Sequence, residues 1–236
     1  MTEIKTFADD VTLARAVAED WLELLRENAG PHLAALSGGR IASTFFAAVA
    51  ALPRRFGPFL GKIHFFWADE RCVSPDDNES NFRLADENLF RPLRIAPERI
   101  HRIRGELPPE IAATEASHEV RRIAQQDAGG IPVFDLIFLG IGPDGHTASL
   151  MPNARPAVLQ SREPYVHVDN SPKPPPNRIT MTYPVLAAAR EVWVMVTGEG
   201  KTEAFRESLR PDGKTPFARV LQSRAETRIY SDIGAP

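Results

Sequence analysis

The chain has 236 residues, of which 43% are hydrophobic and 25% are charged, proportions typical of one globular domain. Its 28 Lys and Arg residues against 31 Asp and Glu leave a net charge of −3, so electrostatics gives no reason to expect nucleic acid or a membrane as partner. A single cysteine excludes an intrachain disulfide framework, and without a signal-peptide core or an apolar run of about 20 residues we expect a cytoplasmic protein.

Helical and strand patterns alternate along almost the whole chain. In the first third of the chain we expect a helix over 9–28, a strand over 32–36, a helix that follows the turn at 37–39 and ends at Ala51 before Pro53, and a strand over 63–67. Two helices over 79–90 and 109–127 follow, and then a strand over 134–139. In the last part we expect weaker strands over 165–168 and 178–182, a strand over 192–197, a helix over 201–209 and a last strand over 227–230. The strands are apolar throughout, which predicts an α/β fold with a mostly parallel sheet covered on both faces. Ligands of such sheets bind at the carboxyl ends of the strands, so the residues just after each strand are the candidates for function.

The first candidate segment is the turn after the strand at 32–36. Ser37, Gly38 and Gly39 separate this strand from a helix that Arg40 begins. Two glycines let the backbone approach a ligand closely, and the unpaired N–H groups of a helix start attract phosphate. Ser37 and Arg40 would add a hydroxyl and a charge. An ordinary tight turn is the alternative, because glycine-rich strand–helix turns are common in this architecture.

Charged residues follow the strand at 63–67. Asp69, Glu70 and Arg71 come first, and an acidic and polar run at 76–81 leads into the next helix. Carboxylates beside an arginine at the end of a strand can orient a base or hold a charged substrate. The alternative is a solvated turn followed by a Ser/Asn helix cap. No histidine neighbours Cys72 in the sequence, so we do not expect a cysteine nucleophile.

The glycine-rich loop after the strand at 134–139 is the most specific segment. Residues 140–145 match G-x-G-x-x-G, but Pro143 removes a donor and Asp144 places negative charge where a dinucleotide pyrophosphate needs bare amides. We expect a rigid loop that displays Asp144 and His146, because a histidine in such a loop can accept a proton at neutral pH. The other five histidines have no comparable setting. Since no metal-binding spacing or cysteine pair accompanies His146, we expect no metal site.

Two basic positions occur late in the chain. Arg178 follows the proline-rich stretch 173–176, and Lys201 ends the turn 198–201 between a strand and a helix. Both could complete a phosphate site, the arginine as a bidentate fork and the lysine as a point charge. The alternatives are a stiff linker and an ordinary turn with an exposed lysine.

Together these segments resemble the 6-phosphogluconolactonase family, in order and over nearly the whole chain. The matching stretches are 37–39, 69–71, 140–149, 173–182 and 198–201, of which 142–146 is the most specific. The resemblance implies one Rossmann-like α/β/α sandwich over residues 1–236. It also implies hydrolysis of 6-phospho-D-glucono-1,5-lactone to 6-phospho-D-gluconate in the oxidative pentose phosphate pathway, with no organic cofactor or metal.

The same resemblance implies roles for individual residues. His146 would be the catalytic base that activates water, while Asp69, Arg71 and Asp144 would support it or the substrate; which of these three contacts His146 directly is left open. The phosphate would be surrounded by Ser37, Gly38, Gly39, Arg178 and Lys201, with Arg40 as a weaker candidate. The partner would be this sugar phosphate lactone alone, with no nucleic acid or membrane, and the protein would be a monomer or a weak homo-oligomer.

Two other functions are weighed against this one. Glucosamine-6-phosphate deaminases share the fold and the Asp-Gly-His loop, but they carry Glu at the position of Met151 and Tyr at the position of Arg71. Both departures favour the lactonase. A sugar-phosphate sensor domain is the second alternative, which would bind without turnover; no basic helix-turn-helix segment accompanies the pattern.

Overall fold

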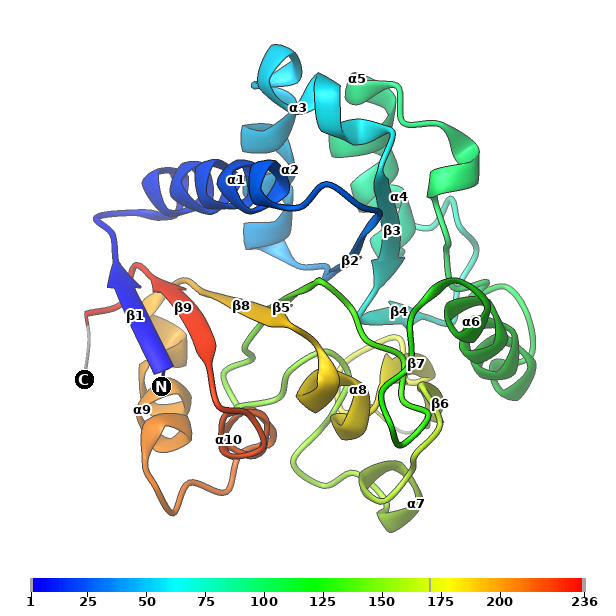
Figure 1. The fold of residues 1–236 in the computed structure, drawn as a ribbon. Helices are drawn as coiled ribbons and strands as arrows, with labels where there is room; N and C mark the ends of the chain where they lie inside the picture. The colour runs from blue at the N-terminus through cyan, green and yellow to red at the C-terminus, as the bar shows by residue number, and fades with distance from the viewer. Residues whose placement is uncertain (1, 170, 235–236) are drawn as a thin grey trace.

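A six-stranded, fully parallel sheet forms the centre of the computed structural model, which describes residues 2–169 and 171–234 (Figure 1). The spatial order is β1-β9-β8-β5-β2-β3, with β1 at Thr2–Thr6, β2 at His32–Leu36, β3 at Ile63–Trp67, β5 at Leu136–Gly140, β8 at Glu191–Val196 and β9 at Thr227–Ser231. Strands β2, β5 and β8 are almost wholly buried, as apolar strands covered on both faces must be. The predicted α/β class and its mostly parallel sheet are confirmed.

Helices cover both faces of this sheet. Helices α1 (Asp10–Glu27) and α2 (Arg40–Ala50) lie on one side, and α9 (Thr202–Leu209) and α10 (Pro216–Gln222) lie on the other (Figure 1). Asp9 caps α1 by accepting a hydrogen bond from the backbone N–H of Thr12. Trp21 on the buried stripe of α1 packs against the rings of Phe45 and Phe138, with centroids 6.0 and 5.1 Å away. The core thus fills the space between α1, α2 and the sheet, and it continues on the other face with Phe205 of α9 and Phe217 of α10.

The weaker strands form a second sheet that is separate from the first. In it β7 (Arg178–Met181) pairs antiparallel with both β4 (Asp69–Arg71) and β6 (Tyr165–Val168), and α6 (Pro109–Ile123) packs against β6. The sequence predicted β6 and β7 but treated 69–71 as a charged turn. Three polar residues are too few to show the alternation that marks a strand in a sequence. This strand is defined only by its pairing with β7.

The remaining helices are short, and the sequence indicated few of them. They are α3 (Pro53–Leu60), α4 (Asn81–Ala85), a π-helical turn (Asp86–Phe90), α5 (Arg91–Leu93), α7 (Pro156–Leu159) and α8 (Tyr183–Ala188). Pro53 opens α3 as well as following α2, and the helix expected from residue 79 begins at Asn81 with Ser80 as its cap. Strand β1 and helices α3, α5, α7, α8 and α10 were not predicted. None of the described helices has the length and apolar character needed to cross a bilayer.

The strand order reverses direction between β2 and β5. From β2 the chain moves to β3 on one side, whereas β5 continues through β8 and β9 on the other. The loops after β2 and β5 therefore diverge and leave a crevice at the carboxyl ends of the strands. A hydrogen bond of 2.8 Å from the Ser37 hydroxyl to the carbonyl oxygen of Phe138 ties the two strands together there.

Candidate active site

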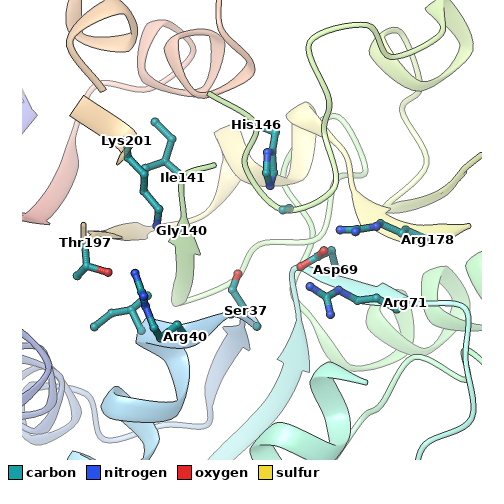
Figure 2. A pocket seen from close by; sticks show the side chains of 14 residues that line it. Ser37, Arg40, Asp69, Arg71, Gly140, Ile141, His146, Arg178, Thr197 and Lys201 are labelled. Atoms are coloured by element: carbon teal, nitrogen blue, oxygen red, sulfur yellow. The ribbon is translucent and has the colours of Figure 1, made fainter. Parts of the chain in front are cut away.

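A cavity of about 370 Å³ lies in this crevice (Figure 2). It is lined by nine of the ten residues that the sequence singled out, namely Ser37, Gly38, Gly39, Arg40, Asp69, Arg71, His146, Arg178 and Lys201. The tenth, Asp144, is hydrogen-bonded to His146 and borders a second cavity. Thr197 also lines the site and was not predicted, although its place at the end of a buried strand was a usable signal. The separate candidate segments thus meet in one place.

The loop after β5 is folded tightly around its own backbone. The N–H of Gly142 donates to the carbonyl of His146 at 2.8 Å, and the N–H of Gly145 donates to the carbonyl of Gly142 at 3.0 Å. A Cβ atom at Gly142 would lie 2.0 Å from two atoms of the His146 ring. Glycine is required there because the imidazole packs directly on the backbone. The ring is therefore held in one orientation by its own loop.

Asp144 is the direct partner of His146. The Nδ1–H of His146 donates to the Oδ1 oxygen of Asp144 in a short hydrogen bond. Burial lowers the pKa of His146 below its ordinary value, and this outweighs the opposing hydrogen bond and charge of Asp144. The imidazole is thus neutral at pH 7. Its Nε2 atom, which has no hydrogen-bond partner among the described residues, is the nitrogen that can accept a proton.

Asp69 forms part of the cavity wall and is only 5% exposed. Its Oδ2 oxygen accepts a hydrogen bond of 2.6 Å from the hydroxyl of Ser149. The amide of Asn81 donates to the Asp69 backbone carbonyl at 2.8 Å and approaches Oδ1 at 3.4 Å. Ser149 and Asn81 therefore fix the Asp69 carboxylate. Sequence reasoning assigned no role in the site to either of them, since they lie 80 and 12 residues away from Asp69.

Glu70 points away from the cavity and caps the next helix. Its carboxylate accepts the backbone N–H groups of Arg71, Asn81 and Phe82 at 2.7–2.8 Å and the hydroxyl of Ser80 at 3.3 Å. Burial raises the pKa of Glu70 to about 7, against the effect of these hydrogen bonds. Glu70 therefore sets the position of Asn81, and through it that of Asp69.

Arg71 and Arg178 lie beside Asp69 at one end of the cavity (Figure 2). The Nη1 atom of Arg71 donates to the carbonyl of Glu79 at 2.6 Å and lies 3.5 Å from the Glu79 carboxylate, while its buried Nε has no partner among the described residues. Arg71 lines the cavity, and its Nη2 has no hydrogen bond to another described residue, so that nitrogen can donate to a ligand. Arg178 instead uses Nε and Nη2 on the carbonyls of residues 173–175, at 3.0–3.2 Å.

The opposite end of the cavity is formed by Arg40, Thr197 and Lys201 (Figure 2). Arg40 is the first residue of α2, and Lys201 ends the 3₁₀ turn Glu199–Lys201 before α9. Burial lowers the pKa of Lys201, and the charge of Arg40 adds to this effect. Two cations and the N-terminus of α2 therefore converge on a small volume. Arg178, which the resemblance grouped with Lys201 around the phosphate, lines the same cavity at its Asp69 end.

The other histidines lie outside the cavity. His32 is fully buried, its Nε2 accepts from the Trp21 indole at 3.1 Å, and burial lowers its pKa to about 4. His64 and His101 contact each other at 2.9 Å next to Glu119. In the described part of the chain, no group of three or more His, Cys, Asp or Glu side chains is placed to hold a metal ion.

Comparison with known proteins gives a consistent result. Residues 8–229 match the family described as glucosamine-6-phosphate isomerases/6-phosphogluconolactonase. The chain is 40% identical to human 6-phosphogluconolactonase over 188 residues, covering 79% of this chain and 71% of that protein. It is 37% identical to the rat 6-phosphogluconolactonase over 215 residues, covering 90% and 82%. Among solved structures, the 6-phosphogluconolactonase of Thermotoga maritima superposes with a TM-score of 0.83 at 28% identity, covering 98% of this chain and 99% of that one.

Proposed function

Because this chain belongs to the glucosamine-6-phosphate isomerase/6-phosphogluconolactonase family, we propose that it hydrolyses 6-phospho-D-glucono-1,5-lactone with His146 as the general base. The product is 6-phospho-D-gluconate, and the reaction is the lactone-opening step of the oxidative pentose phosphate pathway. The observation that carries the mechanism is one cavity with a neutral imidazole between a cationic end and an Asp–Arg end. One sugar phosphate can span such a cavity.

In this proposal the phosphate of the substrate binds at the end of the cavity that Arg40 and Lys201 form. The N-terminus of α2 supplies backbone N–H groups, and Ser37 and Thr197 line the same end of the cavity. Burial and the nearby charge of Arg40 both disfavour the charged form of Lys201, and a bound phosphate dianion would favour it. This proposal departs from the sequence-based expectation for Arg178, whose bonds to backbone carbonyls and place beside Asp69 suit the lactone end.

In the proposed reaction, water attacks C1 of the lactone while Nε2 of His146 takes its proton. Asp144 holds the ring in the tautomer that leaves Nε2 open and stabilises the imidazolium that forms. The oxyanion at C1 is stabilised by Arg71 or by backbone N–H groups of the glycine loops, all of which line the cavity. When the bond from C1 to the ring oxygen breaks, the imidazolium returns its proton to that oxygen.

The demands of this reaction match what the site offers. A δ-lactone is an activated ester, so its hydrolysis needs neither a covalent nucleophile nor a metal ion. One general base contributes roughly 10²–10⁴ in rate, and fixing water and carbonyl in line adds an entropic gain. The phosphate lies far from C1, so its binding energy serves to position the lactone.

Deamination of glucosamine 6-phosphate is the second candidate function within the family. The deaminases carry a glutamate at the position that Met151 occupies here. Met151 is 4% exposed and lines the second cavity beside Asp144, and that cavity presents Asp144 and Asp169 as its only carboxylates among the described residues. The position thus offers no carboxylate to assist ring opening, and we expect no ammonia release from glucosamine 6-phosphate.

The cellular compartment and the partners of the enzyme are proposed from its composition. The charge of −3 and the single cysteine fit a cytoplasmic protein that binds no nucleic acid. We also propose that the protein is a monomer or a weak homo-oligomer.

Replacement of His146 by Ala tests the proposal. We expect at least a hundredfold lower kcat for the phosphorylated lactone at pH 7, after spontaneous hydrolysis is subtracted. In the wild type, activity should fall as pH drops with a midpoint below about 6.5, because burial lowers the pKa of the base. Activity of the variant within about threefold of wild type would remove His146 from the mechanism, whatever the role of the cavity.

A further inference from the structure

A lysine that the proposed mechanism does not use approaches the Asp144–His146 pair. The Nζ atom of Lys173 lies 3.9 Å from Oδ1 of Asp144, the same oxygen that accepts the hydrogen bond from His146. The Lys173 side chain is 42% exposed, so solvent reaches it on the side away from Asp144. One carboxylate oxygen is therefore shared between an imidazole and an ammonium group.

The backbone of Lys173 is held in place by several contacts. The N–H of Ser171 donates to the carbonyl of Pro176 at 2.9 Å, and the N–H of Lys173 donates to the hydroxyl of Ser171 at 3.3 Å. The buried guanidinium of Arg178 donates hydrogen bonds to the carbonyls of Lys173 and Pro174 at 3.0 and 3.2 Å. A segment fixed in this way presents the lysine at a defined position, in contrast to an ordinary surface lysine on a flexible turn.

The charged groups that act on His146 come from three elements. Asp144 lies in the same loop, Asp69 lies on β4, and Lys173 lies on the proline-rich segment. The two carboxylates favour the imidazolium form, whereas Lys173 and burial favour the neutral form. Lys173 also contributes to the ionised state of Asp144. Without a cation here, the two carboxylates would hold the base in its protonated, inactive state over a wider range of pH.

We propose that Lys173 is a positioning residue of the Asp144–His146 pair, whose ammonium lies against the carboxylate oxygen that binds His146 and offsets the charge of Asp144 at the imidazole. Arg178 supports this role by fixing the segment that carries Lys173. The inference rests on the proposed function, since it presumes that His146 acts as the base.

The test compares Lys173→Gln and Lys173→Arg with wild type across pH 5–8. In Lys173→Gln we expect the acidic limb of kcat/KM to move to higher pH by about half a unit or more, because a charge a few ångströms away is removed. Lys173→Arg retains the positive charge, so the acidic limb of its kcat/KM profile should stay at the wild-type pH. Raising the salt concentration should shift the wild-type limb toward that of Lys173→Gln and shift the variant less. A purely structural role would lower activity at every pH alike.

Lys214→Gln serves as the matched control, because it removes one positive charge from an exposed position outside the cavity. NMR titration of the His146 ring gives a second readout that does not depend on turnover, and its midpoint should rise in Lys173→Gln only. An unchanged limb and an unchanged His146 titration in Lys173→Gln would overturn the inference. If His146→Ala stayed active, His146 would not be the base, and if the wild type failed to hydrolyse the phosphorylated lactone, the proposed function would fail; both outcomes are distinguishable from a failure of the inference on Lys173.

Discussion

His146 combines three features that a general base needs in one side chain. Its ring rests on Gly142, its Nδ1 is bonded to Asp144, and burial lowers its pKa so that the neutral form prevails at pH 7. The loop supplies the first two through local backbone geometry. The third depends on the rest of the molecule, because desolvation comes from neighbouring elements.

Lys201 allows the proposed phosphate end to be tested at the same scale. We expect Lys201→Met to raise KM for the phosphorylated lactone about tenfold or more, since a charge-assisted hydrogen bond contributes roughly 1.5–3 kcal/mol. The KM for the unphosphorylated glucono-δ-lactone, measured in parallel, should hardly change, and Lys201→Arg should restore part of the affinity. An unchanged KM for the phosphorylated substrate would move the phosphate to another part of the cavity.

At the scale of elements, the site depends on how the loop after β2 packs against the start of α4. A Cβ atom at Gly38 would lie 1.8 Å from Oδ1 of Asn81, the residue whose amide holds Asp69. Glu70 fixes Asn81 from the other side through its bond to the backbone N–H. The glycine is therefore required by contact between two elements whose touching residues, Gly38 and Asn81, lie 43 positions apart in the sequence (81 − 38).

A double-mutant cycle measures this contact. Gly38→Ala should destabilise the protein by about 1–3 kcal/mol, the usual cost of overpacking, and should lower kcat by displacing Asn81 from Asp69. Asn81→Ala removes the amide that clashes, so Gly38→Ala should cost clearly less in that background. Urea unfolding of the four proteins provides the free energies. Strictly additive costs would mean that Gly38 and Asn81 are not coupled.

For the molecule as a whole, one parallel sheet joins the beginning and the end of the chain. All five residues of β1 pair in register with β9, from Thr2 with Thr227 to Thr6 with Ser231. The cavity is likewise assembled from loops that follow β2, β3, β5 and β8 of the same sheet. The second, three-stranded sheet contributes Asp69 and Arg178 to that cavity rather than a site of its own.

This arrangement predicts a single domain over residues 1–236, which calorimetry can check. We expect one cooperative unfolding transition in which the calorimetric enthalpy equals the van't Hoff enthalpy. Saturating 6-phosphogluconate should raise its midpoint as one peak, because a ligand that binds only the folded state stabilises the whole cooperative unit. Two resolved transitions, or a ligand effect on part of the heat absorption, would contradict a single domain.

The sequence by itself determined the features that depend on neighbouring residues. The spacing of apolar residues defines α1, the buried strands and hence the parallel sheet, and the residues after β2 and β5 form the glycine turns that the motifs indicated. Where local pattern was weak, prediction failed. Strand β4 has three polar residues and exists through its pairing with β7, and β1 is an edge strand that β9 defines.

Only the tertiary structure decided how the charged residues are distributed around the site. Arg178 and Lys201 were equivalent in the sequence, yet one binds backbone carbonyls beside Asp69 and the other joins Arg40 at the opposite end. Likewise Asp144, and not Asp69, contacts His146, and Lys173 reaches the same carboxylate. The physical reason is that backbone conformation follows from local sterics and periodicity, whereas the partner of a charge depends on distances between segments that only folding brings together.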